Sequence, residues 1–306
     1  MYNIVKSWTY IFKEPKWWLK LGIVFALTTL MFLVSLSFGA FEKSPEFREI
    51  GYYDYSLSPV LILLCGIFVV VFLVYAIVLG WYQYENTQAA IQNRTTKGIW
   101  EGSFVDNFKK AGKYAIHSLL FGIVAGMVLG ILMLGIYCML VVLLGSLMAT
   151  VDSSAMFTHT ADPKVFVFFA FICCAALFFV FLAYIYQFLI LLPNQLRLIA
   201  TNTFGEGFKL GRNLYLAKKY LGAYLGLFGI FLLHIAVYLV LYVGYSIASF
   251  TVGVGSTHIS IMAIIYAVIN FFLMLISTYF TVFVFSHMSG SMYRHILEKE
   301  GENYLL

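Results

Sequence analysis

Residues 59–82 read PVLILLCGIFVVVFLVYAIVLGWY, a stretch without a single Lys, Arg, Asp or Glu. An apolar run of about 20 residues is long enough to cross the hydrocarbon core of a bilayer as a helix. Similar uncharged runs occupy residues 21–41, 115–150, 165–193, 221–250 and 259–286. The sequence therefore predicts an all-α, polytopic membrane protein with six transmembrane helices.

The composition supports one membrane domain covering residues 1–306. Apolar residues make up 62% of the chain and charged residues 11%, against about 25% charged in a soluble domain. Pumps, proton relays and voltage sensors normally carry ionisable groups within the membrane, and these runs carry no Lys, Arg, Asp or Glu. The net charge of +5 fits basic residues held on one side of a bilayer, so we expect no nucleic-acid partner.

The connections between the runs differ strongly in charge. Sixteen of the nineteen Lys and Arg residues lie in the N-terminal segment, the second and fourth connections and the C-terminal segment. The remaining three, Lys43, Arg48 and Lys164, lie with six acidic residues in the other connections. Basic residues stay on the cytoplasmic side, so we predict both termini there, an even number of spans and a location in the cytoplasmic (inner) membrane.

The third run is longer than a simple span requires. Residues 115–150 would extend about 54 Å as a helix, against about 30 Å of hydrocarbon. Two structures fit this length: one tilted or kinked helix, or a broken segment. The sequence leaves both open.

Aromatic residues four positions apart, followed by a lysine, precede the first, third and fifth spans. These motifs are Trp8/Phe12/Lys13, Phe104/Phe108/Lys109 and Phe204/Phe208/Lys209. Rings at i and i+4 share one helix face, so each motif predicts an amphipathic interfacial helix with its lysines among lipid headgroups. Neighbouring residues extend these surfaces: Trp17, Lys110, Lys218 and Lys219. We predict three diverged repeats of interfacial helix plus membrane hairpin, over about 1–96, 97–200 and 201–295, although aromatic and basic residues are common at membrane interfaces anyway.

Three short motifs resemble a known family. They are Tyr10-Ile-Phe12-Lys13-Glu14-Pro15-Lys16-Trp17, Phe204-Gly-Glu-Gly-Phe208 through Lys218-Lys219-Tyr220-Leu221, and His287-Met-Ser-Gly290-Ser-Met-Tyr293-Arg294. Together they resemble a family of uncharacterised prokaryotic six-helix membrane proteins, a domain of unknown function whose opening signature is Phe-Lys-acid-Pro-x-Trp. This chain departs from the family in its longer connection Glu42–Ser58. The resemblance implies the fold and topology, and no catalytic residue.

Few polar groups lie deep in the spans. Gln187, His234 and Asn270 are the candidates; they either join neighbouring helices, at about 0.6–2 kcal/mol each, or line a polar transport path. Gly122, Gly126 and Gly130 recur every four residues, which favours close helix packing within or between subunits.

The sequence contains no Ser-His-acid set, metalloprotease helix or phosphate-binding glycine loop. We therefore expect no enzyme activity, cofactor or metal. The leading hypothesis is a non-enzymatic membrane component, an assembly or accessory subunit that binds protein partners or lipid through its basic interfacial helices. The expected partners are membrane lipids and a membrane or cytoplasmic protein, or a second copy of the chain. The alternative is a passive carrier, channel or lipid-handling permease with its path between the repeats.

Overall fold

The computed structural model describes residues 4–42, 59–148, 178, 181–183, 185–252, 259–302 and 305. Within these ranges the regular elements are all helices, which confirms the predicted all-α class. The long helices are α2 (Trp17–Glu42), α4 (Pro59–Gln92), α5 (Phe104–Met148), α9 (Leu221–Val252) and α10 (Ile259–Tyr279). The short ones are α1 (Ile4–Thr9), η1 (Tyr10–Lys13), η3 (Gln187–Leu191), α7 (Leu192–Thr201), η4 (Phe204–Phe208), α8 (Leu210–Lys219), η5 (Phe280–Phe285) and α11 (Ser286–Lys299).

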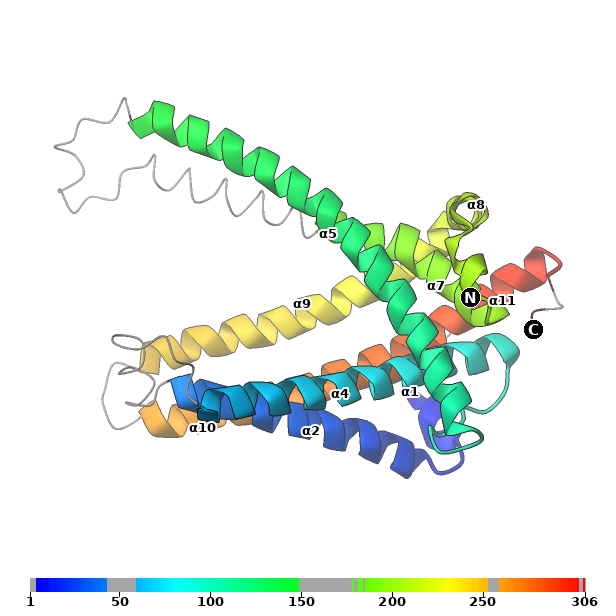
Figure 1. Ribbon diagram of the computed structural model, residues 1–306, viewed down its shortest axis with the longest axis horizontal. Coiled ribbons are helices and arrows are strands. Elements are labelled where there is room, and N and C mark those ends of the chain that lie inside the picture. Colours follow the sequence, from blue (N-terminus) through cyan, green and yellow to red (C-terminus); the bar gives the residue numbers. More distant parts are fainter. Residues whose placement is uncertain are drawn as a thin grey trace.

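Five helical segments of the described chain are long and apolar enough to cross a membrane. They are Trp17–Ser35, Cys65–Gln92, Phe181–Thr201, Leu221–Tyr238 and Ala267–Lys299. Such a set is typical of a multi-pass membrane protein. In Figure 1, α2, α4 and α10 lie side by side, and α9 follows α10 at a wider angle. The predicted count of six spans is not confirmed.

The third apolar run forms part of a single helix, α5. This helix has 45 residues, so residues 115–148 form no break or hairpin. Figure 1 shows it curving gently away from the α2, α4 and α10 group. Residues 149–150, most of the predicted fourth span at 165–193 and the connection at 43–58 lie outside the described residues.

The three aromatic motifs do not share one local structure. The first lies in α1 and η1, ahead of α2, and the third lies in η4, ahead of α8 and α9. The second motif is different because Phe104 begins α5 itself, and no separate interfacial helix precedes that span. The threefold repeat of helix plus hairpin is therefore not confirmed.

All Lys and Arg residues of the described part lie in residues 4–20, 84–113, 194–222 and 287–302, which we call the basic end. The largest buried side chains also lie in it or next to it, among them Trp81, Tyr84, Tyr224 and Tyr293. Along the apolar part of α4, by contrast, Val69 and Val70 are exposed. Exposed apolar side chains are expected where a helix faces lipid tails. The tightly packed core of the described residues therefore lies at the basic end and not along the apolar part of α4.

Candidate functional site

A buried carboxylate fixes the turn that follows α4. Glu85 is 1% exposed, and both of its carboxylate oxygens accept hydrogen bonds from the Arg94 guanidinium, one of them at 3.2 Å. The backbone N–H of Lys97 donates to Glu85 Oε1 at 2.9 Å. Asn93, with a φ of 51°, reverses the chain just after α4 ends. A charge-assisted, two-pronged bond of this kind holds the loop back against its own helix.

The opening motif is anchored to that same loop. Lys20 is completely buried, and its Nζ donates to the Thr96 carbonyl oxygen at 2.6 Å and to Thr96 Oγ1 at 2.9 Å. The Thr96 N–H donates to Glu14 Oε2 at 3.0 Å, and Glu14 and Lys20 are 3.5 Å apart. A buried ammonium needs such partners because isolated burial is costly. The acid of the motif therefore ties the start of the chain to the loop after α4.

A second buried cluster joins α7, α8 and the residues after α11. Arg197 and Arg212 each donate to one oxygen of the Glu302 carboxylate, and Arg197 Nε lies 3.5 Å from Glu206 Oε2. Burial raises the cost of a charge on Glu302, but the two arginine hydrogen bonds outweigh it and lower the pKa of that carboxyl. On Glu206 the hydrogen bond from Lys209 is the main cause of a lowered pKa.

Gly207 and Gly290, in two of the three motifs that resemble the family, allow close contacts between elements. A Cβ on Gly290 would overlap the Thr87 carbonyl oxygen and lie 2.8 Å from the Ala90 Cβ, so α11 packs on α4 through bare backbone. A Cβ on Gly207 would lie 2.8 Å from His117 Nε2. Instead, that nitrogen lies 3.1 Å from the Gly207 carbonyl oxygen, which can only accept. Both glycines are required by packing.

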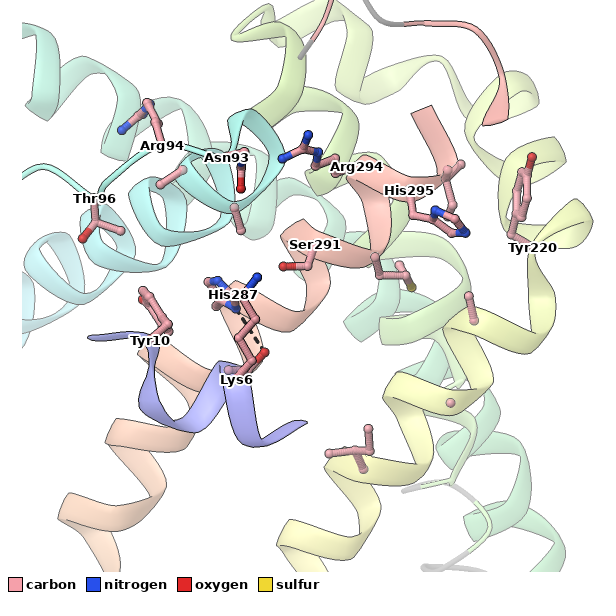
Figure 2. Close-up of a pocket in the computed structure, with 18 of the residues that line it drawn as sticks. Lys6, Tyr10, Asn93, Arg94, Thr96, Tyr220, His287, Ser291, Arg294 and His295 are labelled. Atoms are coloured by element: carbon pink, nitrogen blue, oxygen red, sulfur yellow. Dashed lines mark hydrogen bonds between the residues drawn. The ribbon is translucent and has the colours of Figure 1, made fainter. Parts of the chain in front are cut away.

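A cavity of about 1010 Å³ lies between α1, the end of α4, the start of α9, and α11. Figure 2 shows Lys6, Tyr10 and His287 together on one side of it, with Arg294 further along the same helix as His287, α11, and Asn93 contributed by the turn after α4. The rings of Tyr10 and His287 stack with centroids 4.1 Å apart, and His287 Nδ1 lies 3.0 Å from Ser7 Oγ. Most of the titratable residues that line the cavity are basic, and the full set is Lys6, Tyr10, Glu14, Arg94, Tyr220, His287, Arg294, His295 and Lys299.

The polar residues predicted within the spans are not brought together at this cavity. His234 lies 3.4 Å from Ser277 Oγ and stacks on Phe280 with centroids 4.0 Å apart, so it joins α9 to α10. Gln187 is exposed at the start of η3, and Asn270 is half-buried in α10. None of the three lines the cavity. The described residues also contain no group of three or more His, Cys, Asp or Glu that could hold a metal ion.

Most of the predicted interfacial residues are exposed. The exposed ones are Trp8, Phe12, Lys13, Trp17, Phe104, Phe108, Lys109, Phe208, Lys209, Lys218 and Lys219, and the half-buried ones are Lys110 and Phe204. Rings within each motif touch: Phe12 and Trp17 lie 5.2 Å apart, and Phe204 and Phe208 5.0 Å. Lys209 and Lys219 already bond acids within the chain, at Glu206 and Glu300.

The glycine stripe on α5 has no close neighbour among the described residues. Gly122, Gly126 and Gly130 are exposed, and a Cβ on any of them would meet no atom within 4 Å. Packing of this face inside the described part of the subunit is therefore not observed. Packing between subunits stays a prediction.

Sequence reasoning missed the charged residues that are buried. Lys20, Glu85 and Arg197 lie just outside the ends of apolar runs, and Glu302 lies in the C-terminal segment, all positions where charges usually meet headgroups or water. Position alone gives no signal of burial there. One clue was present, since Glu14 belongs to the opening motif, and that acid is the residue that holds the Thr96 loop.

Comparison with known proteins gives one match. A family model described as a protein of unknown function (DUF4013) matches residues 62–250. The matched segment contains the Phe204–Phe208 motif, whereas the opening and closing motifs lie outside it. Neither the curated proteins nor the solved structures contain a match to the chain. Because the family model covers more than half of the 306 residues, the protein belongs to the DUF4013 family of proteins of unknown function.

Proposed function

We propose that the protein is a non-enzymatic component of the cytoplasmic (inner) membrane, an assembly or accessory subunit that binds a protein partner or membrane lipid through its basic end. The observation that supports it is a division of the basic residues into two groups. Lys20, Arg94 and Arg197 bond acids or carbonyls within the chain. The second group, which includes Lys13 and Lys109, is exposed and lies in the same segments as exposed aromatic rings.

The exposed group draws on the three aromatic motifs and the residues that extend them. Lys13, Lys109 and Lys218 are exposed, and so are the rings of Phe12 and Phe108. Basic residues near an anionic membrane surface contribute about 1 kcal/mol each, and aromatic rings favour the interface. Each of the three segments thus offers exposed basic and aromatic side chains suited to anionic headgroups or to an acidic protein face.

The proposal includes six spans with both termini in the cytoplasm. The charge asymmetry of the connections supports this orientation. In Figure 1, α1 and α11 lie at the same end of the molecule, as an even number of spans requires. The threefold repeat over 1–96, 97–200 and 201–295 also remains part of the proposal, supported by the spacing of the three motifs.

Native mass spectrometry of the protein, extracted gently from its own membrane, tests the proposal. The variant is Lys13→Gln/Lys109→Gln/Lys218→Gln, one exposed lysine from each segment. Lys113 and Lys219 are left intact because they bond Asn202 and Glu300 inside the chain. We expect the wild type to carry a stoichiometric protein partner or anionic lipid, and the triple variant to lose most of it.

A matched control removes the same three charges from the predicted outer side, as Lys43→Gln/Arg48→Gln/Lys164→Gln. This control should keep the bound species. A wild type that carries nothing, or a triple variant that retains its partner as fully as the control does, would contradict the proposal.

A carrier, channel or lipid-handling permease is the second candidate, and the cavity of about 1010 Å³ favours it. Gln187, His234 and Asn270 do not line that cavity, so flux should depend on the cavity and survive alanine at all three. Movement of fluorescent phospholipid between the leaflets of reconstituted vesicles is the measurement. Vesicles that contain the protein but exchange lipid no faster than empty vesicles would remove this candidate.

A further inference from the structure

We infer that the cavity at the basic end is a binding site for one anionic phospholipid, with the headgroup phosphate among the basic side chains and an acyl chain along α9. The inference rests on the proposed function in one respect, which is that the basic end faces the cytoplasmic leaflet. It goes further by assigning the lipid to a particular cavity, formed by α1, α4, α9 and α11. Pockets for small molecules usually measure about 300–1,000 Å³, so this one is at the large end.

The charge of the lining fits an anion. Lys6, Arg94, Arg294 and Lys299 line the cavity with one carboxylate, Glu14. Arg94 donates from all three of its guanidinium nitrogens to groups within the chain, so it has no N–H donor left for a ligand. Among the described residues Arg294 donates only its Nε–H, to Glu298, so its Nη groups remain as donors for a phosphate. Basic pockets between membrane helices on the cytoplasmic side commonly hold anionic headgroups.

A buried hydroxyl at the cavity lacks a partner. Tyr10 is 8% exposed, lines the cavity, and has no hydrogen bond from its hydroxyl to any of the described residues. An unsatisfied buried polar group is costly and calls for an explanation, of which a partner from outside the chain is one. Tyr10 shares this feature with other buried groups, but its side chain lines the cavity. Burial, helped by nearby Glu14, raises the pKa of Tyr10 well above its usual value, so the hydroxyl stays protonated and can donate to a phosphate oxygen.

The opposite wall is apolar and lies within a span. Gly222, Ala223, Gly226 and Ile230 line the cavity from α9, inside the membrane-spanning candidate Leu221–Tyr238. From the first to the last of them the helix rises about 12 Å. A small soluble anion gains no hydrophobic binding energy from such a wall, whereas an acyl chain buries apolar surface against it. A cavity with basic side chains at one end and an apolar wall at the other favours an anionic amphiphile over a small soluble anion.

The test is a titration of detergent-purified protein with phosphatidylglycerol or phosphatidylcholine, followed by native mass spectrometry. We expect one phosphatidylglycerol to be retained at least tenfold more tightly than phosphatidylcholine. Free glycerol phosphate should not displace it, because the acyl contact is then absent. Displacement by the free phosphate, or equal retention of the two lipids, would overturn the inference.

Two glycines of α9 give a matched pair of variants. A Cβ meets nothing within 4 Å at Gly222, which lines the cavity, or at Gly229, which does not. Gly222→Leu fills the cavity and should weaken phosphatidylglycerol retention at least tenfold, while Gly229→Leu should leave it unchanged. Equal retention by the two variants would place the lipid elsewhere.

Tyr10→Phe removes the hydroxyl and keeps the ring that stacks on His287. We expect about a fivefold loss of phosphatidylglycerol retention with no loss of thermal stability, because no hydrogen bond to any of the described residues is removed. Full retention by this variant and by Gly222→Leu, together with loss in the Lys13/Lys109/Lys218 variant, would overturn the cavity site and leave the proposed function standing. The reverse pattern would support the cavity and overturn the proposed surface.

Discussion

In the basic end, charged side chains are buried and bonded to each other, whereas along α4 even large apolar side chains such as Ile62 and Val70 are exposed. The two regions are therefore held by different interactions. Lipid tails are as apolar as the spans, so the spans gain little hydrophobic energy from one another. The basic end fixes its elements with directed bonds between charged and polar groups. Geometric precision in this protein is thus concentrated where a ligand or partner would bind.

The largest effect should come from breaking the Arg197–Glu302–Arg212 cluster. In Glu302→Gln, the Arg197 side chain, 4% exposed, keeps its charge and loses its main partner. Removing one member of a buried pair costs about 3–5 kcal/mol, and we expect about 3 kcal/mol because Arg212 is half exposed to solvent. Equilibrium unfolding in mixed detergent micelles measures this. Glu298→Gln, at an exposed pair, is the control and should be indistinguishable from wild type.

The pH dependence of stability sharpens the same contrast. The pKa of Glu302 is below its ordinary value of 4.5, so in the folded state the carboxyl holds fewer protons than in the unfolded chain. Its contribution to stability is therefore complete above about pH 4.5 and is lost as the pH falls through the lowered pKa. Glu302→Gln should flatten this acid limb of the unfolding curve. An unchanged slope would show that the cluster does not couple to folding.

A smaller effect should follow from separating α4 and α11. Gly290→Ala places a methyl group against the Thr87 carbonyl oxygen and the Ala90 side chain. Overpacking of this kind costs about 1–3 kcal/mol, measured as a lower free energy of unfolding. Gly229→Ala on α9 meets no atom within 4 Å and serves as the control. If both variants unfold alike, the close contact between α4 and α11 does not contribute to stability.

The smallest effect is expected in the spans. Ser277→Ala removes the contact between α10 and His234 of α9, 3.4 Å long, and polar contacts between membrane helices average about 0.6 kcal/mol. Ser35→Ala is the matched control, because among the described residues the Ser35 hydroxyl donates to the Met31 carbonyl oxygen of its own helix and not to another helix. A loss in Ser277→Ala as large as in Glu302→Gln would remove the distinction between the two regions.

The sequence predicts the regular features of this protein well. Uncharged runs of this length predict helices, because a continuous helix satisfies all of its backbone hydrogen bonds in lipid within one segment. The asymmetry of Lys and Arg locates the basic end. The family resemblance is confirmed at the level of a domain of unknown function. These features depend on composition over twenty residues, so the details of single contacts do not affect them.

The partners of individual charges could not be predicted. Lys20 resembles a headgroup anchor in sequence, yet it is buried against Thr96, which lies 76 positions later. Glu85 follows an apolar run by three residues and is equally hidden. A charge pattern gives the sign and the side of the membrane but not the distance to the next opposite charge in space. The cavity could not be predicted either, because its walls come from four separate elements.

The chain separations of these bonds have a consequence for biosynthesis. The contacts of Glu14 and Lys20 with Thr96 can form once the first two long helices have been made. The contact of Ser7 with His287 joins residues 280 positions apart, and the hydrogen bond between Arg197 and Glu302 joins residues 105 positions apart. A ribosome therefore releases nearly the whole chain before the basic end can close. A lipid that binds in the cavity can therefore enter it during synthesis, before the last of its walls is in place.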